Sequence, residues 1–121
     1  MSYDIGLYPP QVNDPSEEIM SPLQVDAHED GGTFVAGGTT DAWLNVTYNY
    51  SECYRLFEFS LTDLDRKTAS ETEERLADLV EKLGTARYPD YWAPTPGNAG
   101  HALSILLGWA RQHPDGVWSV S

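Results

Sequence analysis

The sequence has few basic residues and a single cysteine. Of its 121 residues, 7 are Lys or Arg and 19 are Asp or Glu, which gives a formal net charge of −12. Binding to nucleic acid or to an anionic membrane requires cationic contacts, so this composition argues against direct binding of either. The lone Cys53 excludes an internal disulfide and a multi-cysteine zinc site, and it fits a reducing cytoplasm.

The chain also lacks a long apolar run. Its start, MSYDIGLYPP, has neither the basic region nor the apolar stretch of a secretory signal. The most apolar segment, residues 96–110, contains Asn98 and His101 and is too short to span a bilayer. We therefore expect a cytoplasmic protein with no membrane partner.

Basic residues are missing altogether from the first part of the chain. No Lys or Arg precedes Arg55, although nine Asp and Glu residues do. Such a segment can simply keep the protein soluble. Alternatively, it can form an acidic face that docks on a basic protein, including one whose own role is to bind nucleic acid.

Residues 96–113 are predicted to form the central helix of the core. Apolar residues recur at helical spacing on nearly all sides of this segment, which is typical of a buried helix. Thr95 is a suitable N-cap, Pro96 suits the first helical position, and Pro114 ends the helix. Leu103 and Leu106 are expected to be almost inaccessible to solvent.

The remaining pattern predicts a second helix and a small antiparallel sheet. Residues 70–83 carry one apolar stripe, with Ser70 and Glu73 as a capping box and Gly84 at the end. Strands are predicted at residues 3–8, 33–36 and 41–50, with a Gly37-Gly38 turn, and residues 11–32 are read as a loop. The sequence thus predicts one α+β domain over residues 1–121.

The predicted strand 41–50 is the most informative segment for function. Its even positions place Leu44, Val46, Tyr48 and Tyr50 toward the core. Its odd positions form a polar row of Asp41, Trp43, Asn45, Thr47 and Asn49, and Phe34 falls on the same face. Asparagine is unfavourable in strands, and amides beside a tryptophan are typical of a polar pocket. Alternation alone leaves open whether this face lines a pocket or meets solvent.

The start of the helix at residues 96–113 could complete such a pocket. The first turn of a helix has free backbone N–H groups that can hold an anion, although Thr95 can equally cap its own helix. Two aromatic residues precede this turn. The candidate ligand-binding residues are therefore Asp41, Trp43, Asn45, Thr47, Asn49, Tyr91, Trp92, Thr95 and Asn98.

Signals for catalysis and metal binding are weak. His28, His101 and Asp41 show none of the usual ligand spacings, and the glycine pairs are not followed by the residues of a phosphate loop. Cys53 lies among aromatic residues, which favours an inert, packed thiol, and no serine sits in a nucleophile elbow. We expect no metal, no cofactor and no catalytic residues, with a small hydrolase as the minor alternative.

Four segments of the sequence carry a resemblance. They are GGTFVAGGTTDAWLNVTYNYS at 31–51, DYWAPTPGNA at 90–99, the apolar helix that follows, and PDGVW at 114–118. Together they resemble a group of small, uncharacterised proteins of phages, prophages and bacteria. The resemblance implies a phage-associated, intracellular setting, in which small acidic proteins often counter host defences.

The sequence therefore predicts a non-enzymatic binding protein that captures a small polar or nucleotide-like ligand. The alternative is an acidic inhibitor that docks on a basic host protein. The oligomeric state is left open, a homo-oligomer included.

Overall fold

The computed structural model describes residues 2–10, 22–28, 39–90 and 92–121. Its main sheet has three strands, with β1 (Ser2–Tyr8) in the centre, β4 (Trp43–Thr47) on one side and β5 (Val117–Val120) on the other. Both neighbours run antiparallel to β1. The strand predicted at 3–8 is confirmed, but the C-terminal segment was not expected to supply a strand. The predicted strand at 33–36 and its Gly37-Gly38 turn lie outside the described residues.

A second, two-stranded sheet is formed by β2 (Gln24–His28) and β3 (Thr39–Asp41). The interpretation of residues 11–32 as a loop was therefore wrong over β2, while residues 11–21 and 29–32 lie outside the description. Backbone hydrogen bonds join the two sheets at one corner, from the Leu7 N–H to the Ala42 carbonyl and from the Leu23 N–H to the Leu7 carbonyl. Ala42 is fully buried where the chain bends from β3 into β4.

The segment predicted as one strand over 41–50 changes conformation after Thr47. The Thr47 side chain accepts a hydrogen bond from the Asn49 N–H, and a 3-10 helix, η1 (Tyr48–Tyr50), follows. It leads into α1 (Ser51–Arg55). Leu44, Val46 and Tyr50 are buried as predicted, but Tyr48 is 39% exposed, because the chain has left the strand before this residue.

The free edge of β5 is covered by the segment that precedes the second helix. The Trp118 N–H donates to the Lys67 carbonyl, and the Trp118 carbonyl accepts from the Arg66 N–H. The Trp118 side chain is buried, and its indole N–H donates to the Thr72 hydroxyl at 2.8 Å. A short 3-10 helix, η2 (Leu61–Leu64), precedes this segment.

Helix α2 (Ala69–Leu83) carries its apolar stripe on Leu76, Leu79 and Leu83, as the sequence predicts. Its capping box, however, is made by Thr68 and Glu71 rather than by Ser70 and Glu73. Thr68 forms a β-bridge with Val117, so the chain is still extended there and the helix begins directly after it.

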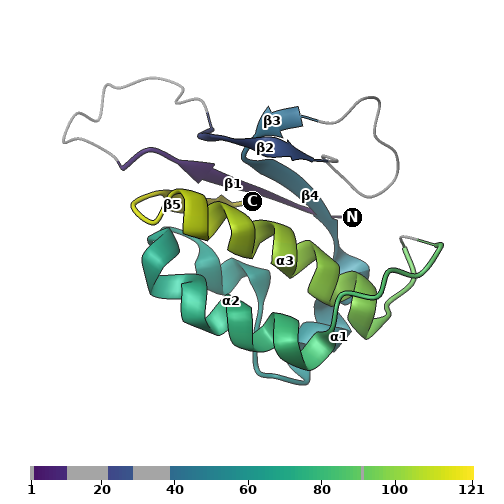
Figure 1. The fold of residues 1–121 in the computed structure, drawn as a ribbon. Coiled ribbons are helices and arrows are strands. Elements are labelled where there is room, and N and C mark those ends of the chain that lie inside the picture. Colours follow the sequence, from purple (N-terminus) through teal and green to yellow (C-terminus); the bar gives the residue numbers. More distant parts are fainter. Residues whose placement is uncertain (1, 11–21, 29–38, 91) are drawn as a thin grey trace.

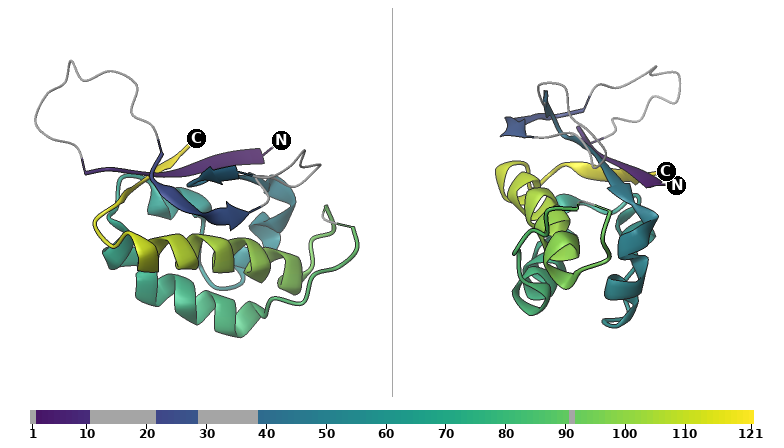
Figure 2. Two further views of the ribbon diagram at one scale, coloured as in Figure 1. Left: turned by 45° about the horizontal axis from the view of Figure 1, so that its top comes forward. Right: turned by 90° about the vertical axis from the view of Figure 1, so that its right-hand side faces the viewer.

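Helix α3 (Pro96–Gln112) begins at the Thr95 cap, as predicted. It lies beside α2, and the two helices pack under the main sheet (Figure 1 and Figure 2). Leu103 and Leu106 are fully buried, which confirms their predicted place. A Cβ at Gly100 would lie 1.8 Å from the Gly84 carbonyl oxygen, so only glycine lets the chain that leaves α2 pass so close to α3.

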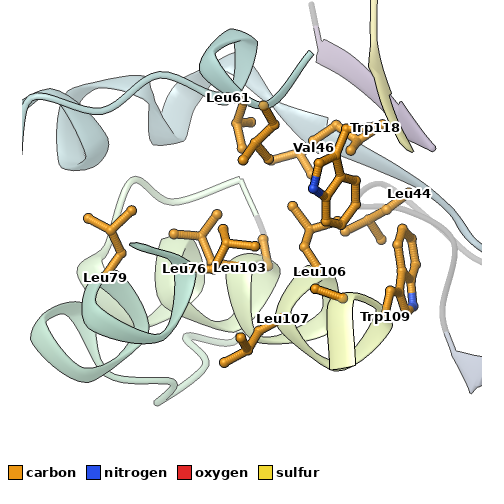
Figure 3. Close-up of a cluster of buried hydrophobic side chains, with 14 of the residues drawn as sticks. Leu44, Val46, Leu61, Leu76, Leu79, Leu103, Leu106, Leu107, Trp109 and Trp118 are labelled. Atoms are coloured by element: carbon orange, nitrogen blue, oxygen red, sulfur yellow. The ribbon is translucent and has the colours of Figure 1, made fainter. Parts of the chain in front are cut away.

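The core fills the space between the main sheet and the two long helices. Figure 3 shows Leu44 and Val46 of β4 and Trp118 of β5 facing leucines of α2 and α3. The predicted α+β class, a small antiparallel sheet packed by two main helices, is confirmed. Among the helices that the structure describes, none combines the length and the apolar character needed to cross a membrane.

Candidate functional site

The polar row predicted on one strand is divided between two sheets. Trp43 and Asn45 lie on β4, where they pair with Gly6 and Asp4 of β1. Asp41 belongs to β3 instead, on the other side of the bend at Ala42. The row therefore does not form one continuous face, because the chain changes its pairing partner between Asp41 and Trp43.

Asn45 binds residues of the neighbouring strand. Its side-chain amide donates to the Ser2 hydroxyl at 2.6 Å and to the Asp4 carboxylate at 2.9 Å. Both N–H groups of the amide are thus engaged by β1. These bonds link β4 to β1, and Asp4 is exposed.

Asp41 makes a similar contact in the second sheet. Its carboxylate accepts a hydrogen bond from the side-chain amide of Gln24 at 2.7 Å. The side-chain carbonyl oxygen of Gln24 accepts a hydrogen bond from the Thr40 hydroxyl at 2.8 Å. The backbone carbonyl of Gln24 also lies 2.6 Å from the His113 ring, which ties β2 to the end of α3. Gln24 was not singled out in the sequence, and no local signal marks it.

Thr47 and Asn49 lie where β4 ends. Thr47 is buried and caps η1. Asn49 lies beyond the strand, and its side-chain amide donates to the Trp92 carbonyl at 2.9 Å. That contact joins the end of β4 to the loop before α3, so two parts of the predicted site do meet.

Thr95 and Asn98 are both used by the protein itself. The Thr95 hydroxyl accepts the Asn98 N–H at 3.1 Å, which is the ordinary N-cap interaction. The Asn98 side chain is buried and accepts from the Tyr88 N–H while donating to the carbonyls of Asp90 and Ala93. Asn98 is therefore a clamp for the preceding loop.

Cys53 contacts the same loop, which precedes α3. Its thiol contacts the Pro94 carbonyl at 3.4 Å, and burial, with a smaller effect of Glu52, raises the pKa of the thiol. A thiol with a raised pKa stays protonated at neutral pH and is a poor nucleophile. Of the predicted site residues, Tyr91 lies outside the described part of the chain.

The described residues show no group of three or more His, Cys, Asp or Glu that could hold a metal ion. Comparisons of the chain with protein-family models, with characterised proteins and with solved structures find no match. The resemblance to phage-associated proteins, and the role of the nine candidate residues in binding a ligand, therefore stay predictions.

Proposed function

We propose that the protein is a non-enzymatic binding protein that docks on a basic protein surface through its first 54 residues, called here the cation-free segment. The observation that carries this proposal is the pairing of Asp4, an exposed carboxylate of this segment. Its carboxylate accepts a hydrogen bond from the neutral amide of Asn45. A neutral donor satisfies the geometry of a carboxylate but leaves its negative charge in place.

Carboxylates of the helical layer are paired differently. Asp78 lies 3.0 Å from the Lys82 ammonium and 3.5 Å from the Arg75 guanidinium, and Glu73 lies 3.9 Å from Arg111. The charges of α2 and α3 therefore partly cancel. Strands β1 to β4, which contain no Lys or Arg, lie across the core from α2 (Figure 1).

With nine Asp and Glu residues and no Lys or Arg, the cation-free segment carries a net negative charge. Such a charge accelerates association with a positive surface and disfavours acidic partners. If the resemblance to phage-associated proteins holds, the partner is a basic host protein in the bacterial cytoplasm, and the protein acts as a counter-defence inhibitor.

The test is capture of the partner at two salt concentrations. The immobilised protein is incubated with bacterial lysate, and bound proteins are identified and quantified by mass spectrometry. We expect one basic protein to be retained in stoichiometric amount at about 0.05 M salt and largely released at about 0.5 M, since screening weakens exposed charge pairs. Retention that does not respond to salt would contradict docking through charge.

A second candidate function is capture of a small polar ligand. The contact between Asn49 and Trp92 favours it, because it brings the end of β4 to the start of α3 as the predicted pocket requires. Native mass spectrometry of protein purified from its cellular setting tests this candidate. A bound small molecule that is absent from an Asn49→Ala variant supports it, and a ligand-free spectrum of the wild-type protein contradicts it.

A further inference from the structure

We draw no further inference here: the strongest candidate, the exposed Leu56 side chain at the turn after α1, carries no proposal because nothing in the structure shows what covers it.

Discussion

The side chain of Asn98, at the start of the central helix, accepts a hydrogen bond from the backbone N–H of Tyr88 at 2.9 Å. One partner is buried and the other is among the most exposed aromatic residues of the described chain. The contact couples the buried start of α3 to the exposed loop that precedes it. Loop and helix should therefore respond together to changes at Asn98.

Replacing Asn98 by alanine should destabilise the protein by about 1–3 kcal/mol, because it leaves a part-buried N–H and two carbonyls without their partner. Urea denaturation measures the loss. Asn49→Ala removes one exposed hydrogen bond to the same loop and is the matched control, with an expected loss under about 1 kcal/mol. Equal losses in the two variants would show that Asn98 is not the principal clamp.

Two glycines of α3 should respond in opposite directions to substitution by alanine. Gly100→Ala places a Cβ 1.8 Å from the Gly84 carbonyl oxygen and should cost about 1–3 kcal/mol or more. Gly108→Ala meets nothing within 4 Å and should stabilise the helix by about 0.5–1 kcal/mol. Thermal unfolding of both variants checks the pair. A stable Gly100→Ala protein would mean that the connection to α2 does not lie against α3.

Truncation of the core helix should be costly. Leu106 is fully buried between the sheet and the helices, so Leu106→Ala should lower the free energy of unfolding by about 2–5 kcal/mol. Leu56→Ala is the control for the same chemical change, because Leu56 is 80% exposed. It should change stability by less than about 0.5 kcal/mol. A loss below about 1 kcal/mol at Leu106 would contradict the packing of α3.

Stability in acid should depend on the cap of α2. Hydrogen bonds from the Thr68 backbone N–H and then the Thr68 hydroxyl lower the pKa of Glu71 from its usual value of 4.5. A group whose pKa is depressed in the folded state stabilises the protein above the unfolded value, and this contribution is lost as the pH falls through the folded value. Stability should therefore decline below about pH 4.5.

Two variants check that assignment. Glu71→Ala should flatten the decline in unfolding free energy over the acidic range, and Thr68→Ala should flatten it to a similar degree. The double variant should add little further, because both residues belong to one interaction. An unchanged pH profile in Glu71→Ala would assign the acid sensitivity to other carboxylates.

The two long helices could be predicted from the sequence because their signals are local. Thr95 and Pro96 begin α3, and the apolar stripe of α2 shows the helical period without reference to the rest of the chain. The predicted capping box lies two residues beyond the observed one, because Thr68/Glu71 and Ser70/Glu73 have the same spacing. The choice between them depends on the bridge from Thr68 to Val117.

The short strands and the site depend on distant contacts. Strand β5 has four residues and gains its place by pairing with the other end of the chain, so its own sequence marks it weakly. In the sequence, apolar and polar residues continue to alternate past Thr47. The cap by which Thr47 ends β4 is seen only in the structure. The polar residues of the predicted pocket form hydrogen bonds within the fold, and alternation does not reveal that Asn45 binds β1 or that Asn98 holds a loop.

The most direct test of docking through the cation-free segment compares two triple variants. One is Asp4→Asn/Asp41→Asn/Glu52→Gln, within that segment, and the other is Glu74→Gln/Glu81→Gln/Asp115→Asn, outside it. All six side chains are exposed, and each triple removes three negative charges and changes the formal charge from −12 to −9. The measurement is the affinity for the basic protein captured at low salt.

We predict that the first triple weakens this affinity about tenfold or more and that the second stays within about twofold of the wild-type protein. Equal loss in both triples would mean that net charge alone governs binding. No loss in either would contradict docking through charge.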